Sequence, residues 1–172
     1  MTIHSENPFL DPDADPVRRW RGRLGGAVTL WTSGGSAEHP GRAGLTVSSM
    51  MVAGGERWRV LALLDPDSDL RDTLEATGRG VVQLLQWEHR DLAEVFAGQF
   101  PAPGGPFTVG EWEQTEHGPR LLSAPTWAAV VVESFESVGW SDLVVATVAG
   151  VVLGDDEAPL EHRRGRYLRG GA

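Results

Sequence analysis

Apolar positions along most of the chain follow the spacing of β-strands. Residues 44–50 alternate apolar with small polar side chains, as a strand with one buried face does. Other apolar runs are rich in β-branched residues and end at glycine, serine or proline turns. The pattern predicts strands at residues 27–32, 44–50, 58–64, 81–85, 127–134 and 143–153.

Two stretches have helical spacing instead. Residues 68–78 begin at Ser68, a good N-cap, and end at Gly78, a residue that suits the position after a helix. Residues 89–97, closed by Gly98, carry a short apolar stripe. The resulting order, β-β-β-α-β-α-loop-β-β, predicts a mainly β (α+β) fold, an antiparallel barrel with short helices at its edge.

The chain length of 172 residues suits one domain. Residues 1–16 are polar and offer no packing face, so they are expected to form a loose N-terminal arm before a domain over residues 17–172. The start lacks the pattern of a signal peptide, and no apolar run approaches the ~20 residues that span a bilayer. We therefore expect a cytoplasmic protein with no membrane partner.

Charge and composition narrow the chemistry. A formal net charge of −9 disfavours nucleic-acid binding, because an acidic surface repels phosphate backbones. The chain has no cysteine and no lysine, which excludes thiolate metal ligands and a P-loop. The histidines are scattered, so no metal site is expected, and neither a dinucleotide-binding G-x-G-x-x-G turn nor a G-x-S-x-G elbow is present.

Four segments, in order along the chain, resemble the flavin reductase family of FMN-binding split barrels. Residues 44–50, GLTVSSM, are similar to the family's G-x-T-x-[SN]-S signature. Residues 64–70, LDPDSDL, match a strand-to-helix turn that carries a phosphate-contacting serine. Residues 92–98, LAEVFAG, and 159–167, PLEHRRGRY, are similar to its L-A-x-x-F-A-G and P-L-x-[YH]-x-x-G-x-Y motifs. The order and spacing of the four segments support the resemblance more strongly than any single motif does.

The resemblance implies a flavin site built from two of these segments. The strand would present its polar groups to the isoalloxazine ring, and the turn before the helix would hold the phosphate, aided by the helix dipole. The residues so implied are Thr46, Val47, Ser48, Ser49, Asp67, Ser68, Arg71 and Arg166. Alternatively, Ser68 is a plain helix cap, the strand residues are ordinary solvent-facing positions, and Arg166 belongs to a solvated basic tail. No catalytic side chain is implied, because the flavin itself carries the redox chemistry.

The resemblance implies a homodimeric oxidoreductase that uses NAD(P)H to reduce FMN, with FAD or riboflavin as other flavins for the same cleft. Reduced flavin would then serve a partner monooxygenase. Two segments depart from the family pattern: residues 51–57 replace a stretch ending in two prolines, and residues 139–143, GWSDL, replace a Gly-Asp-His motif. The missing histidine favours one alternative, a flavin carrier or sensor without reductase activity. A third alternative is a β-barrel interaction protein with no cofactor.

Overall fold

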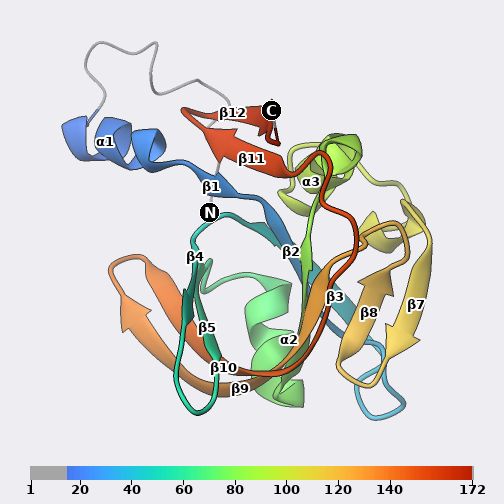
Figure 1. The fold of residues 1–172 in the computed structure, drawn as a ribbon. Coiled ribbons are helices and arrows are strands. Elements are labelled where there is room, and N and C mark those ends of the chain that lie inside the picture. Colours follow the sequence, from blue (N-terminus) through green and yellow to red (C-terminus); the bar gives the residue numbers. More distant parts are fainter. Residues whose placement is uncertain (1–14, 172) are drawn as a thin grey trace.

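The computed structural model describes residues 15–171, and its centre is a seven-stranded antiparallel sheet (Figure 1). The strand order is β3-β2-β6-β9-β10-β5-β4, and every neighbouring pair is antiparallel. The predicted mainly β, antiparallel fold is therefore confirmed. The strands are β2 (Thr29–Gly34), β3 (Arg42–Val47), β4 (Met50–Ala53), β5 (Arg59–Leu64), β6 (Arg79–Leu84), β9 (Trp127–Val138) and β10 (Ser141–Val152).

The sheet curls because its two edge strands, β3 and β4, follow one another in the chain. Only Ser48 and Ser49 separate them, so the chain leaves one edge of the sheet and enters the other at this corner. The carbonyl of Ser49 accepts a hydrogen bond from the amide of Leu63 at 3.1 Å, which extends the contact with β5 toward the corner. Two register shifts between β9 and β10 add further bend. The result is the split barrel that the sequence predicts.

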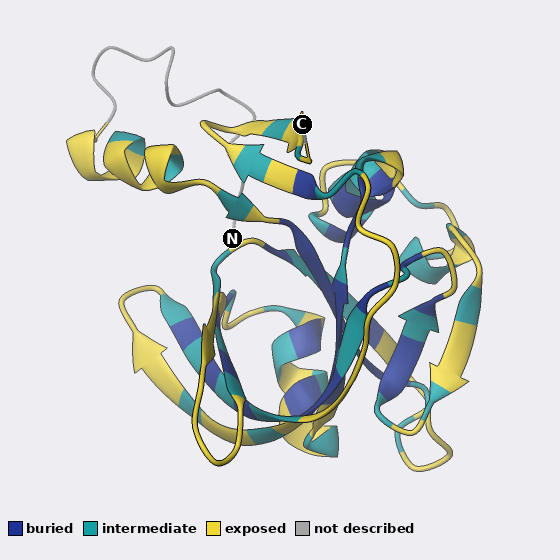
Figure 2. Cartoon of the chain, in the orientation of Figure 1, coloured by how far each residue is buried: buried dark blue, intermediate teal, exposed yellow. Residues whose placement is uncertain are grey.

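Two apolar cores lie on the two faces of this sheet (Figure 2). Inside the barrel, Leu70 and Leu74 of helix α2 (Asp69–Thr77) pack with Trp31 of β2 and with apolar side chains of β5, β6 and β10. On the outer face, helix α3 (Arg90–Phe96) packs through Phe96 against the hairpin of β7 (Trp112–Thr115) and β8 (Gly118–Leu121). Short 3-10 turns, η1 (Trp87–His89) and η2 (Pro106–Thr108), border this second core.

A separate three-stranded sheet joins the two ends of the described chain. It has the order β1-β11-β12 and consists of β1 (Gly26–Ala27), β11 (Leu160–Arg163) and β12 (Arg166–Arg169). We call it the terminal sheet. Helix α1 (Pro16–Leu24) lies beside it and has no buried residue (Figure 1). None of the helices in residues 15–171 is long and apolar enough to cross a membrane.

Helix α1 was not predicted. The expected loose arm at residues 1–16 falls mostly on residues 1–14, which lie outside the described residues. Its last two residues start the helix instead: Asp15 accepts a hydrogen bond from the amide of Val17 at 2.9 Å, and Pro16 occupies the first helical position. An aspartate followed by proline is a known helix-start signal, so this element was recognisable from the sequence.

Candidate functional site

The corner between β3 and β4 holds four of the predicted flavin-binding residues. Val47 is buried in the barrel core, and the hydroxyl of Thr46 donates to the carbonyl of Ala93 in α3 at 2.7 Å. Ser48 is exposed and Ser49 is half-buried. Among the described residues, the hydroxyls and amides of these two serines have no hydrogen-bond partner. A rigidly anchored strand therefore ends in a corner with free polar groups.

Ser68 lies at the start of α2, as predicted, and its side chain caps the helix. Its hydroxyl accepts a hydrogen bond from the amide of Arg71 at 3.2 Å and donates to the carbonyl of Asp65 at 2.7 Å. Asp67 is exposed in the same turn, and its amide donates to the Asp65 carboxylate at 2.9 Å. The proton of the Ser68 hydroxyl is thus used within the turn, and a phosphate would have to replace the Asp65 carbonyl as its acceptor.

The guanidinium of Arg71 is held by carboxylates. Its Nε donates to Asp142 at 2.8 Å, and its Nη1 pairs with Glu75 one helical turn further along α2. The ring of Phe135 lies under the guanidinium, with its centroid 4.6 Å from Cζ. Hydrogen bonds to Asp142 and then to Glu75 raise the pKa of Arg71 above its ordinary value. Arg71 therefore joins α2 to the β9–β10 hairpin, and its charge is balanced inside the protein.

The turn between β9 and β10 shows what stands where the family pattern expects Gly-Asp-His. Trp140 is 99% exposed at this turn. Asp142, two residues on, accepts hydrogen bonds from Arg71 and from the hydroxyl of Ser137 at 3.2 Å. The turn therefore offers an exposed indole and a carboxylate that already has two partners, in place of an imidazole.

Arg166 lies apart from the start of α2. It belongs to β12 of the terminal sheet, at the opposite end of the molecule from α2 (Figure 1). Its strand neighbour Arg163 lines a groove of about 400 Å³ whose other lining residues are Arg23, Leu24, Gly25, Gly26, Ala27, Glu161 and His162. A Cβ added to Gly26 would come within 3.3 Å of the Ser48 carbonyl, so the groove adjoins the β3–β4 corner. The sequence shows both arginine clusters but not that they meet here.

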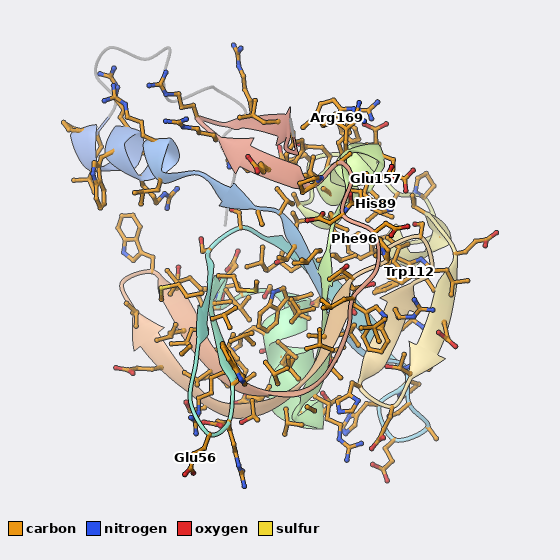
Figure 3. The ribbon with its side chains drawn as sticks, in the orientation of Figure 1. Glu56, His89, Phe96, Trp112, Glu157 and Arg169 are labelled. Atoms are coloured by element: carbon orange, nitrogen blue, oxygen red, sulfur yellow. The ribbon has the colours of Figure 1, made fainter. Side chains whose placement is uncertain are left out.

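His89, which the sequence left without a role, is buried beside the second core; Figure 3 shows it on the same side of the molecule as Phe96 and Trp112. Its Nδ1 accepts a hydrogen bond from the amide of Gln86 at 2.9 Å, so the neutral ring carries its proton on Nε2. That nitrogen lies 3.0 Å from the hydroxyl of Ser123 and donates to it. A ring that donates to the serine cannot activate it as a nucleophile, so this pair is structural.

Acidification should destabilise the protein through His89. Burial lowers the pKa of His89 below its usual value, against a smaller opposing effect of Glu88. The unfolded chain therefore binds the proton more readily, and the contribution of His89 to stability is complete above the unfolded pKa of about 6.5 and is lost as the pH falls below it. We expect the free energy of unfolding, from urea titrations at pH 7, 6 and 5, to fall less steeply in His89→Gln. Equal slopes in parent and variant would contradict this assignment.

Known proteins resemble this chain over most of its length. Residues 21–171 match the family model described as "Flavin reductase like domain". The chain is 28% identical over 149 residues to the FMN reductase (NADH) RutF of Agrobacterium fabrum, which covers 85% of this chain and 83% of that protein. It is 27% identical over 114 residues to the 4-hydroxyphenylacetate 3-monooxygenase reductase component of Pseudomonas aeruginosa, covering 66% of this chain and 65% of that protein.

Solved structures share the fold. The NADH:FAD oxidoreductase SgcE6 of Streptomyces globisporus superposes with a TM-score of 0.80 at 22% identity, over 93% of this chain and 95% of that chain. The styrene monooxygenase flavin reductase of Pseudomonas putida gives a TM-score of 0.78 at 20% identity, over 91% and 97% of the two chains. The family match covers the barrel and the terminal sheet alike. The resemblance found in the sequence is confirmed, and the chain belongs to the flavin reductase-like domain family.

Proposed function

We propose that the protein is an NAD(P)H-dependent flavin reductase that binds FMN and supplies reduced flavin to a monooxygenase. The family supports this activity, as do relatives named as an FMN reductase (NADH) and as the reductase component of a monooxygenase. A bound flavin supplies the hydride-accepting chemistry, while the protein binds and orients it. The observation that carries the proposal is the pair of unpartnered serines at the β3–β4 corner.

This corner fits the polar edge of an isoalloxazine ring. That edge presents nitrogen and oxygen atoms, and the amides and hydroxyls of Ser48 and Ser49 supply donors that no described residue uses. Val47 in the core and the Thr46 hydrogen bond to α3 keep the strand in place, so the donors are held ready for a ligand. We propose that these four residues orient the ring, with no side chain acting as acid or base.

We also propose that the flavin phosphate meets the first turn of α2. Ser68 and the amides that follow it lie at the positive end of the helix dipole, which favours an anion. The exposed carboxylate of Asp67 opposes a phosphate, and its backbone amide, the group that could contribute, already donates to the Asp65 carboxylate. Arg71 adds little free charge, since Asp142 and Glu75 already balance it. The assignment therefore depends chiefly on Ser68.

Replacing Ser68 by alanine separates its two roles. The loss of an N-cap should lower the free energy of unfolding by about 1 kcal/mol. The loss of a hydrogen bond to a charged group should weaken FMN binding by about 1–3 kcal/mol, measured by flavin fluorescence titration. Thr73→Ala is the control, because its hydroxyl donates to the Asp69 carbonyl within the same helix and should leave FMN affinity unchanged. A less stable Ser68→Ala protein with parental FMN affinity would leave Ser68 as a helix cap alone.

We propose that the protein acts as a homodimer in the cytoplasm. Exposed apolar side chains support an interface on β4 and its surroundings, including Met51, Val52 and Trp58 at 65%, 56% and 59% exposure. Exposed apolar side chains are typical of residues that an interface buries. Sedimentation at micromolar concentration measures the assembly, and a Met51→Glu, Val52→Glu variant should sediment as a monomer. A parent protein that sediments as a monomer would contradict the proposal.

The activity is tested by titrating the purified protein with FMN under anaerobic conditions and then adding NADH or NADPH. Saturable quenching of flavin fluorescence followed by bleaching of the flavin absorbance is the expected result. Saturable binding without bleaching would favour the carrier or sensor alternative, for which the indole of Trp140 in place of a histidine is the structural argument. Absence of flavin binding would contradict both functions.

A further inference from the structure

The fold brings two arginine-rich segments together. Residues 18–23 and 163–169 hold eight of the fifteen arginines of a chain whose net charge is −9. The amide of Arg164 donates to the carbonyl of Gly22 at 2.8 Å, and Gly26 pairs with His162 in the ladder of β1 and β11. Figure 3 shows Arg169 at the other end of β12, toward α3, so Arg163 and Arg166 are the strand arginines nearer to α1, with Arg164 in the turn between them. An acidic protein therefore has one basic end.

Within the described part of the chain, these arginines have no carboxylate partner. Elsewhere, five of the seven arginines pair with carboxylates within 4.0 Å, namely Arg59, Arg71, Arg79, Arg90 and Arg120. Within residues 15–171, none of the eight arginines of the two segments has an ion-pair partner, although the chain has 24 acidic residues. Arg21 and Arg23 gain from the negative end of the α1 dipole, but the β11–β12 hairpin has no helix end of its own. Clustered positive charges without counter-charges create a positive potential that attracts anions.

The turn of the β11–β12 hairpin supports this interpretation. Arg164 has φ 53° and is the one residue other than glycine with positive φ in the described chain, and Gly165 follows it with φ 73°. Two-residue hairpin turns of this kind favour asparagine, aspartate or glycine, because a Cβ is strained in the left-handed region. Turn geometry therefore does not explain why an arginine occupies position 164, between Arg163 and Arg166.

A groove runs between the two segments. It has a volume of about 400 Å³, and both Arg23 and Arg163 line it. A Cβ on Gly25 would meet the Arg163 side chain at 3.5 Å, so that side chain lies across the glycine. Glu161 also lines the groove and partly offsets its charge. Burial and the nearby Arg21 lower the pKa of His162, so this ring adds no charge at neutral pH.

We propose that this groove binds the pyrophosphate of the nicotinamide dinucleotide, with Arg23 and Arg163 as its direct ligands and Arg166 as a supporting charge. The proposal rests on the reductase function and assigns a place to its second substrate. An arginine guanidinium binds phosphate oxygens through paired N–H donors. A dinucleotide has two phosphates and can occupy several arginines at once, whereas FMN has a single phosphate. Because Gly26 in the groove wall lies against the Ser48 carbonyl, a dinucleotide held here begins next to the corner assigned to the flavin ring.

The test uses the whole chain of 172 residues and ADP as a probe that carries the pyrophosphate without redox chemistry. We expect saturable ADP binding by calorimetry and competition between ADP and NADH in the flavin-reduction assay. In the double variant Arg23→Gln, Arg163→Gln, the Kd for ADP and the KM for NADH should each rise about tenfold or more. Its kcat at saturating NADH and its Kd for FMN should stay within about twofold of the parent values.

The control is the double variant Arg79→Gln, Arg120→Gln, which removes the same charge from the β7–β8 side, where these arginines pair with Glu116 and Glu113. It should leave ADP and NADH binding unchanged, and equal losses in both double variants would show a general charge effect and overturn the proposal. A groove variant that loses FMN affinity but keeps ADP affinity would assign the groove to the flavin phosphate and also overturn it. A parent protein that binds ADP but never oxidises NADH would refute the reductase function while leaving the anion site in place.

Discussion

Replacing Arg71 by glutamine should lower the free energy of unfolding by about 3 kcal/mol, because it removes one partner of a largely buried ion pair. The side chains of Arg71 and Asp142 are 18% and 11% exposed. Without the Nε donor at 2.8 Å, the Asp142 carboxylate keeps only the Ser137 hydroxyl among the partners seen here, at 3.2 Å. The ring of Phe135 also loses the cation stacked on it. Urea denaturation at neutral pH measures the change.

An exposed ion pair supplies the matched control for Arg71. Arg79 pairs with Glu116 at 2.7 Å, with side chains 48% and 72% exposed, so Arg79→Gln should cost about 0–1 kcal/mol. If Arg71→Gln costs no more than this, the contact with Asp142 is not structural. Arg71 would then be available to a phosphate, and the flavin-binding role implied by the family resemblance would regain weight.

Replacing Gln83 by leucine should lower the free energy of unfolding by about 2–3 kcal/mol, the cost of leaving a buried amide without an acceptor. Gln83 is fully buried in β6. Its side-chain carbonyl accepts from the amide of Leu121, and its Nε2 donates to the hydroxyl of Thr32 at 3.2 Å. That hydroxyl in turn donates to the carbonyl of Pro119, so the network fastens β8 to β2 and β6. Leucine fills a similar volume but satisfies none of these groups.

Gln99→Leu is the control for Gln83→Leu, since Gln99 is exposed and its side chain makes one long contact, to the Ala97 carbonyl at 3.5 Å. This surface substitution should change stability by no more than about 0.5 kcal/mol. Thermal and urea unfolding of both variants would distinguish loss of the network from a general effect of adding an apolar side chain. Equal stability of the two variants would show that the Leu121 amide finds another acceptor.

Strands with a strong apolar period were predictable, while short polar strands were not. The expected strands at residues 58–64 and 81–85 correspond to β5 and β6 within a few residues, because β-branched and apolar side chains there serve the core. β11 and β12 escaped prediction because their arginines, glutamate and histidine resemble a solvated tail. Their pairing depends on β1, at the other end of the chain, and a local pattern cannot show such a partner.

In the candidate site, too, local signals were predictable from the sequence and contacts between distant segments were not. The sequence identified the cap at Ser68, because a hydroxyl at a helix start is a local signal. It singled out Ser48 and Ser49 as polar groups but placed them inside one strand over residues 44–50, so the corner between β3 and β4 was missed. It did not identify Asp142 as the partner of Arg71, since the two residues meet only through the folding of β10 against β5 and α2. The flavin-binding residues themselves stay predictions, to be decided by the affinity measurements on Ser68→Ala.

The terminal sheet has a consequence for how the protein is made. β1 and α1 leave the ribosome early, but the strand that pairs with β1 is synthesised near the end of the chain, at Leu160–Arg163. The barrel strands are complete once β10 has emerged, whereas the arginine groove must wait for β11. A chain interrupted before residue 160 would therefore carry every strand of the seven-stranded sheet and still lack the groove, so the groove forms only after the barrel strands have been made.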